Sequence, residues 1–226
     1  MKTLLKTFLV VVVLAFTFTG VSAHAATIDL NTWTSATDGT ISTTSGTVTV
    51  AFNANGSADY LYASYVSYLP TATYADGIIV NNAPSSSNNI IHLVGGNANI
   101  NTITFSTPVV NPVIVIWSLG NSSTTASFNF IDATPTLVAG GVSSEYGGLP
   151  ITVSGNDVSG VEGNGTVEFL GTFSNISWTN PVYEDWYGFN VGITGSAATS
   201  VPEPTTMLLL GLGLMGLAGV RRKFKN

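Results

Sequence analysis

Aromatic and acidic side chains come together in one short stretch near the C-terminal end of the chain. Residues 183–189 read Tyr-Glu-Asp-Trp-Tyr-Gly-Phe. Aromatic rings can stack on the apolar faces of sugar rings, and carboxylates accept hydrogen bonds from hydroxyl groups. The composition of the stretch is typical of an exposed turn, whereas Trp117 and Trp178 lie in apolar strand patterns typical of a core. The stretch therefore predicts a sugar-binding site at Tyr183, Glu184, Asp185, Trp186 and Tyr187.

A catalytic site is less well supported by the sequence. Glycosidases use two carboxylates that flank the scissile bond, but Glu184 and Asp185 are adjacent and would face opposite sides of a strand. Glu162 and Glu168 are separated by a predicted turn. His92 lies in an apolar strand pattern, and no Gly-x-Ser-x-Gly elbow accompanies it. We therefore predict no catalytic residues and no enzymatic activity.

Calcium is the one cofactor that the composition favours. Hard cations take oxygen ligands, which carboxylates in Asn- and Gly-rich loops supply. Residues 157–162 and the Glu184–Asp185 pair are the best such loops, although the chain has no EF-hand motif. The alternative interpretation is that these carboxylates bind no ion and form a solvated acidic surface. Asp157 and Glu162 are accordingly weak candidates for metal ligands.

Charge is distributed unevenly along the chain. All six Lys and Arg residues lie before residue 27 or after residue 200, whereas eleven of the twelve acidic residues lie between these positions. A domain without basic residues cannot displace counterions from phosphates, which excludes nucleic acid as a partner. Its carboxylates must be solvated, hydrogen-bonded or bound to cations. The chain has no cysteine, so its core is stabilised without disulfides.

Short alternating patterns dominate residues 27–200. In residues 47–52 an apolar side chain recurs at every second position, which predicts a half-buried strand. Residues 113–117 are a continuous apolar run, typical of a strand buried on both faces. Turn residues such as Asn164-Gly165 and Gly155-Asn156-Asp157 separate the strands. The predicted fold is all-β, an antiparallel β-sandwich with a jelly roll as the first choice of topology.

The N-terminal segment has the composition of a secretory signal peptide. Lys2 and Lys6 precede an apolar stretch that ends at Phe18, and Ala23-His24-Ala25 reads as a cleavage site. Residues 1–25 are thus a predicted signal peptide, with cleavage after Ala23 as the alternative. Residues 26–200 are the predicted β-sandwich ectodomain, which is long enough for one domain with its own core.

The C-terminal segment, residues 201–226, combines three features in a fixed order. Pro202, Glu203 and Pro204 interrupt regular structure after the ectodomain. The apolar residues 205–220 would form a helix of about 24 Å, and we predict that this helix is transmembrane. The basic residues at the end of the chain favour its cytoplasmic side, and they begin with Arg221, Arg222 and Lys223. A simple membrane anchor is the alternative interpretation.

This order of Pro-Glu-Pro, Leu- and Gly-rich helix and Arg-Arg-Lys resembles the PEP-CTERM sorting signal of Gram-negative bacteria. The resemblance implies that an integral-membrane exosortase recognises and processes the signal during export. It also implies a transient stay in the inner membrane, followed by the cell surface or the extracellular matrix. We predict an exported protein with a structural or adhesive role associated with exopolysaccharide. A lectin-like carbohydrate-binding module, assisted by calcium, is the alternative.

Overall fold

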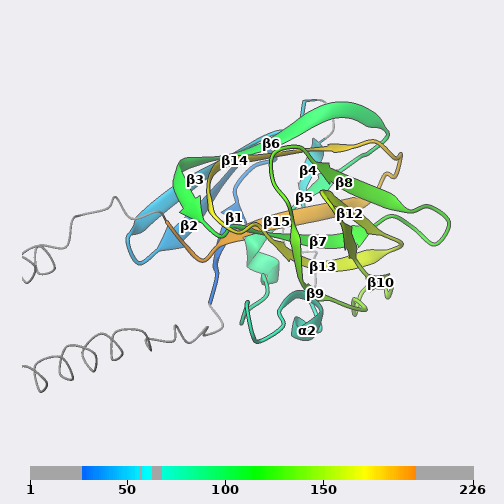
Figure 1. The fold of residues 1–226 in the computed structure, drawn as a ribbon, viewed down its shortest axis with the longest axis horizontal. Helices are drawn as coiled ribbons and strands as arrows, with labels where there is room; N and C mark the ends of the chain where they lie inside the picture. Colours follow the sequence, from blue (N-terminus) through cyan, green and yellow to red (C-terminus); the bar gives the residue numbers. More distant parts are fainter. Residues whose placement is uncertain (1–26, 56–57, 63–67, 197–226) are drawn as a thin grey trace, which may run out of the picture.

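The computed structural model describes residues 27–55, 58–62 and 68–196, and of residues 58–62, 195 and 196 it describes the backbone alone. Figure 1 shows strands in two layers that curve around a common interior, with the short helix α2 (Thr71–Tyr74) outside them. The predicted all-β antiparallel sandwich is confirmed, as a sheet that nearly closes into a barrel. The predicted signal peptide (1–25) and the C-terminal signal with its transmembrane helix (201–226) lie outside the described residues.

Sixteen strands and a 3-10 turn, η1 (Ser86–Asn88), accompany α2 in the described residues. The strands are β1 (Asp29–Trp33), β2 (Asp38–Thr43), β3 (Gly46–Asn53), β4 (Ala58–Tyr62), β5 (Ile90–Leu93), β6 (Asn97–Val110), β7 (Val113–Leu119), β8 (Ala126–Phe130), β9 (Thr136–Gly140), β10 (Leu149–Pro150), β11 (Thr152–Ser154), β12 (Asp157–Gly160), β13 (Gly163–Glu168), β14 (Thr172–Asn180), β15 (Tyr187–Ile193) and β16 (Gly195–Ser196).

The main path of the sheet runs β10-β13-β7-β15-β1-β2-β3-β6-β14-β8-β12-β11. Strand β1 joins the two layers, because its first residues pair with β15 and its last residues pair with β2. The β10–β13 pair is parallel, and the other described pairs are antiparallel. Strands β1, β2 and β3 pair in their sequence order and form a meander, and β3 then pairs with β6.

Strand β3 shows the alternation that the sequence predicts. Val48, Val50 and Phe52 are buried, and the residues between them are exposed. Successive side chains of a strand point to opposite faces, so one face of β3 packs on the interior while the other meets water. The high proportion of Thr at the exposed positions suits this arrangement, since β-branched residues favour strands.

Both faces of β7 are buried, as its continuous apolar run predicts. Ile114 and Ile116 belong to the main core between the two layers. Val115 and Trp117 belong to a smaller cluster, together with two tyrosines of residues 68–74. Strand β7 therefore contributes to the main core with one face and supports a second cluster of side chains with the other.

Aromatic side chains fill the main core. The fully buried ring of Trp178 on β14 lies 5.3 Å from Phe189, 5.8 Å from Phe52 and 5.6 Å from Phe128, measured between ring centroids. Its Nε1 donates a 2.8 Å hydrogen bond to Oδ1 of Asn180, which satisfies the polar edge of the indole inside the core. Trp178 therefore connects β3, β8 and β15 to its own strand.

Two predicted loops are corrected by the structure. Asn164-Gly165 lies inside β13 rather than in a hairpin turn, because the buried Asn164 side chain bridges β13 to β7. Residues 157–162, predicted as a metal-binding loop, begin as strand β12, which pairs with β8. The predicted turn at Gly155-Asn156 is confirmed, since it joins the paired strands β11 and β12.

Candidate functional site

Four rings meet where β5, β7 and the segment before β15 come together. The half-buried ring of Trp186 lies 4.8 Å from the His92 ring and 6.2 Å from the Trp117 ring. Trp117 in turn lies 5.0 Å from the ring of Tyr146. Trp117 is buried, whereas 41% of Tyr146 is exposed. We call His92, Trp117, Tyr146 and Trp186 the aromatic cluster, and its accessible members are Trp186 and Tyr146.

A β-bulge beside the aromatic cluster turns a hydroxyl toward an acid. The register between β13 and β7 shifts at Asn164. Ser118 opposite takes a φ of 54°, and its Oγ donates a 2.8 Å hydrogen bond to Oε2 of Glu162. The Asn164 side chain holds this geometry because its Oδ1 accepts a 2.9 Å hydrogen bond from the Ser118 N–H. Bulges commonly re-aim a side chain in this way.

Glu162 itself is held in a left-handed backbone conformation, with a φ of 52°. Its carbonyl oxygen accepts a 2.8 Å hydrogen bond from Nδ2 of Asn164 and a longer one, 3.3 Å, from the N–H of Leu149. A non-glycine residue in this region stores local strain, which the surrounding contacts must offset. Ser118 and Glu162 are thus two strained residues joined by a side-chain hydrogen bond.

Glu184 is the buried acid of the site, with 4% of its surface exposed. Its Oε1 accepts a 2.9 Å hydrogen bond from the N–H of Trp186, while its Oε2 has no hydrogen-bond partner among the described residues. Burial raises the pKa of Glu184 to about 7. The Trp186 N–H opposes this rise in pKa, and the negative charges of Asp185 and Glu162 add to it.

The phenol of Tyr187 is a second buried polar group under the influence of Glu184. Its ring packs 5.7 Å from Phe128, and its hydroxyl has no hydrogen-bond partner among the described residues. Burial raises the pKa of Tyr187 well above its usual range, and the Glu184 carboxylate raises it further. Residues 184–187 therefore contain two buried oxygen atoms, Oε2 of Glu184 and the Tyr187 hydroxyl, that have no hydrogen-bond partner among the described residues.

Residues 182–186 are fixed to β5 and the loop that follows it. The N–H of Gly95 donates a 2.9 Å hydrogen bond to the carbonyl oxygen of Glu184. Nε2 of His92 lies 2.7 Å from the carbonyl oxygen of Asp185 and donates to it, because a carbonyl only accepts. Gly95 leaves room for this approach, since a Cβ there would overlap the carbonyl oxygen of Val182. These contacts set the position of Trp186.

The structure divides the five predicted sugar-binding residues into two groups. Tyr183 is 66% exposed, Asp185 is exposed and Trp186 is half-buried. Glu184 and Tyr187 are buried, so their side chains do not face a ligand that stays at the surface. Of the predicted aromatic residues, Tyr183 and Trp186 are those that the surface offers to a ligand.

The two predicted metal ligands, Asp157 and Glu162, lie near opposite ends of strand β12. Strand β12 begins at Asp157 and ends before Glu162, which places them roughly 10 Å or more apart. Among residues 27–55, 58–62 and 68–196, no group of three or more acidic or His side chains has metal-binding geometry.

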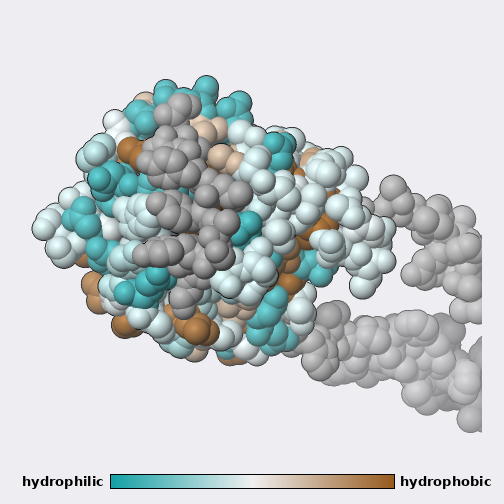
Figure 2. Space-filling view, turned by 180° about the vertical axis from the view of Figure 1, so that it is seen from behind, coloured by the Kyte–Doolittle hydropathy of each residue, from teal (hydrophilic) through white to brown (hydrophobic). Residues whose placement is uncertain are grey.

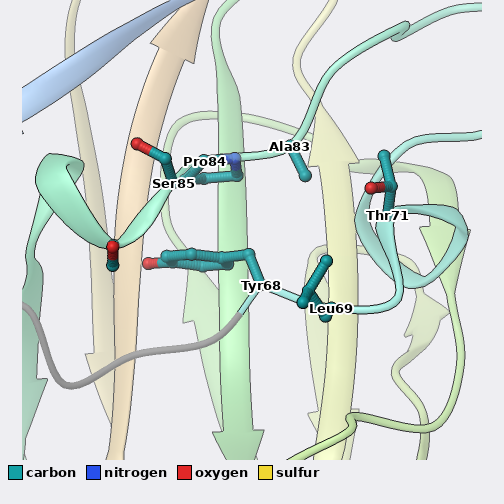
Figure 3. A pocket seen from close by; sticks show the side chains of 7 residues that line it. Tyr68, Leu69, Thr71, Ala83, Pro84 and Ser85 are labelled. Atoms are coloured by element: carbon teal, nitrogen blue, oxygen red, sulfur yellow. The ribbon is translucent and has the colours of Figure 1, made fainter.

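Two hollows lie at the surface of the described residues, and the first adjoins the side-chain cluster that contains Trp117. One, of about 400 Å³, has Tyr68, Leu69 and Thr71 on one chain segment and Ala83, Pro84 and Ser85 on another (Figure 3). The second, also about 400 Å³, shares Ala83 and Ser85 with the first and is lined mainly by polar side chains of residues 29–42 and 82–88. The face in Figure 2 is mostly hydrophilic, with hydrophobic residues in separate small areas.

Three features that connect the site do not follow from the sequence: the contact of Trp117 with Trp186, the place of Tyr146 in the aromatic cluster, and the effect of Glu162 on Glu184. Trp117 itself is buried, as its apolar strand predicts. The Trp117 ring supports Trp186, so its place at the end of a buried strand is part of the site. Nothing in the spacing of Glu162 and Glu184 indicates that they interact, because their proximity depends on the order of β13, β7 and β15 in the sheet.

We expect Gly148→Ala to destabilise the fold and to displace Glu162. Gly148 has a φ of 82°, and a Cβ there would overlap the carbonyl oxygen of Glu162. Backbone strain and steric overlap together should lower the free energy of unfolding by roughly 2–4 kcal/mol, measured by urea denaturation. Gly147→Ala is the matched control, because its φ is 72° but its Cβ would meet open space. That variant should lose only about 1 kcal/mol; equal losses would contradict the steric argument.

Comparison with known proteins identifies the C-terminal segment. Residues 200–223 match the PEP-CTERM protein-sorting motif, which confirms the predicted resemblance. No curated protein matches the chain. In the part of the chain that the structure describes, no helix is both long and apolar enough to cross a membrane. The residues of the sorting signal, Pro202 to Lys223, lie outside that part.

The fold and the motif together define an exported β-sandwich protein. More particularly, the chain carries a PEP-CTERM sorting signal at its C-terminal end. This signal implies membrane-anchored transit and processing by an exosortase, followed by export to the cell surface or the extracellular space.

Proposed function

We propose that the chain is a structural or adhesive component of the cell surface or extracellular matrix and associates there with exopolysaccharide. Its export follows from the sorting motif. The observation that supports a polysaccharide partner is the half-buried Trp186 ring, which His92 and Trp117 hold in one orientation beside the exposed Asp185. A pre-oriented ring loses little conformational entropy when a sugar stacks on it.

The charge of the domain indicates the class of polysaccharide. No Lys or Arg occurs between residues 27 and 200, so an anionic polymer would meet only negative groups on this domain. A neutral polysaccharide avoids that repulsion, and its hydroxyl groups can donate hydrogen bonds to carboxylates such as Asp185. We therefore propose a neutral exopolysaccharide as the partner.

A lectin-like module is the second candidate. Tyr146 and Trp186 both contact Trp117, so two accessible rings belong to one cluster. Two rings with a fixed relation could select one glycan among many, whereas a matrix protein needs only general adhesion. A glycan array with the full-length chain in detergent separates the two candidates. Strong signals on a few glycans favour a lectin, and uniform weak binding to neutral polymers favours the adhesive role.

Trp186→Ala should weaken co-sedimentation of the protein with neutral exopolysaccharide about two- to twelvefold. Loss of one aromatic stacking contact removes about 0.5–1.5 kcal/mol, which corresponds to that range. Trp186→Phe should retain part of the binding. Leu170→Ser is the control, because Leu170 is an exposed apolar residue outside the aromatic cluster. Unchanged binding by Trp186→Ala would argue against a role of this ring.

The proposal includes no catalytic step. The same polysaccharide incubations should release no reducing sugar ends. Release that persists in the wild type and disappears in Glu184→Ala or Asp185→Ala would contradict this part of the proposal and indicate a glycanase.

A further inference from the structure

The negative charge of Glu162 acts on Glu184, and neither acid has a Lys or Arg partner among the described residues. The Glu162 carboxylate accepts a hydrogen bond from Ser118, which follows Trp117 on β7. The Trp117 ring contacts Trp186, whose N–H donates a hydrogen bond to the Glu184 carboxylate. This series of contacts brings the two acids to the same end of β7 and β15. The hydrogen bonds that the two carboxylates accept, from Ser118 and from the Trp186 N–H, both come from uncharged donors. The sequence has no Lys or Arg between residues 27 and 200 that could approach them.

The second observation is the pair of buried oxygen atoms beside these acids. Oε2 of Glu184 and the hydroxyl of Tyr187 are both buried, and neither has a hydrogen-bond partner among the described residues. A buried polar atom without a partner costs about 1–3 kcal/mol, and more if it is charged. A ligand that satisfies these oxygen atoms would recover that free energy.

We infer that Glu184 and Glu162 bind a divalent cation of the calcium type between the β7–β13 bulge and residues 182–186. Oε2 of Glu184 and the carboxylate oxygen of Glu162 that Ser118 leaves free are the proposed ligands. The phenol oxygen of Tyr187 can support the ion as a neutral acceptor. Backbone carbonyls and water would complete the six to eight oxygen ligands that calcium prefers.

Calcium fits this site better than magnesium does. Calcium tolerates irregular geometry, whereas magnesium requires an octahedron and gives up its water reluctantly. The site has two carboxylates whose positions are set by hydrogen bonds from Ser118 and from the Trp186 N–H. An affinity typical of extracellular calcium modules, about 0.1–1 mM, suits an exported protein.

The cation would fix the segment that carries Trp186. Glu184 lies two residues before Trp186, and the ion would connect this segment to Glu162, just before β13. The inference does not depend on polysaccharide binding, because the pair of acids exists whatever the partner of Trp186 is.

The test uses the full-length chain in detergent after treatment with a chelator. Calcium at about a hundredfold excess over its Kd should raise the melting temperature by roughly 5–10 °C, and magnesium at the same concentration should raise it far less. Glu184→Gln and Glu162→Gln should each abolish most of this shift. Asp157→Asn, an exposed acid on β12, is the control and should retain it. No shift in the wild type, equal shifts with both ions, or a full shift in Glu184→Gln would overturn the inference.

A second measurement does not depend on thermal unfolding. Terbium replaces calcium in oxygen sites, and its luminescence is sensitised by tryptophan at close range. Wild-type protein should give sensitised luminescence that calcium displaces, because Trp186 and Trp117 adjoin the proposed site. Glu184→Gln should lose this signal, and Asp157→Asn should keep it. Persistent luminescence in Glu184→Gln would place the ion elsewhere and contradict the assignment.

Discussion

Trp178→Ala should lower the free energy of unfolding by about 3–5 kcal/mol, the largest loss that we expect from a single substitution in this domain. The indole is fully buried and contacts the rings of Phe52, Phe128 and Phe189 from three other strands. Its removal leaves a cavity that rigid strands on both sides cannot close. Domains of this size are stable by only about 5–15 kcal/mol, so much of the margin would be lost.

The polar edge of Trp178 adds to this effect. Oδ1 of Asn180 accepts hydrogen bonds from Nε1 of Trp178 and from Nδ2 of Asn101, each 2.8 Å long. Trp178→Phe keeps most of the packing but removes the first bond, so it should cost about 1–2 kcal/mol. Urea denaturation followed by circular dichroism measures both variants. Tyr183→Ala, at an exposed position, should change stability by less than about 0.5 kcal/mol. A loss below about 1 kcal/mol for Trp178→Ala would contradict this description of the core.

Much of this fold can be predicted from the sequence because burial acts locally on each strand. The alternation at Val48, Val50 and Phe52 determines which face of β3 turns inward. The unbroken apolar run of β7 requires cover on both faces, and the structure provides it. The strand order is not encoded in the same local way. It depends on how β14 and β15 insert beside strands that are distant in the sequence, such as β6 and β7.

The site was harder to predict because it forms between strands. Asn164-Gly165 has the sequence of a hairpin turn, yet it lies at a bulge inside the sheet. There the Oδ1 of Asn164 accepts a hydrogen bond from the backbone N–H of Ser118. That bulge brings Ser118 to Glu162, and no periodic pattern indicates such a contact. The stretch 183–187 was recognised from its composition. Its division into exposed Tyr183 and buried Glu184 depends on contacts with β5 and its loop.

Glu184 should make the stability of the metal-free protein depend on pH between about 4.5 and 7. Burial raises the pKa of Glu184 from 4.5 to about 7 in the folded state. Between these values the unfolded chain releases the Glu184 proton while the folded chain keeps it. The folded state then binds more protons, so stability falls as pH rises through this window and levels off above it.

The measurement compares melting temperatures of the wild type and Glu184→Gln in chelator at pH 4.5 and pH 7. Because neighbouring solvent screens part of the effect, Glu184 should account for about 2 kcal/mol, or roughly 4–8 °C, of the change. Other acids titrate in both proteins: the pKa of Glu168 is raised by burial. Burial also acts to raise the pKa of Asp76, but its backbone hydrogen bonds together outweigh burial and lower the pKa. Their contributions cancel in the difference between the two proteins. Glu184→Gln should therefore lose less stability than the wild type as pH rises, and it should be the more stable protein at pH 7. Parallel pH profiles for the two proteins would show that Glu184 ionises normally. That result would contradict the prediction that burial raises the pKa of Glu184.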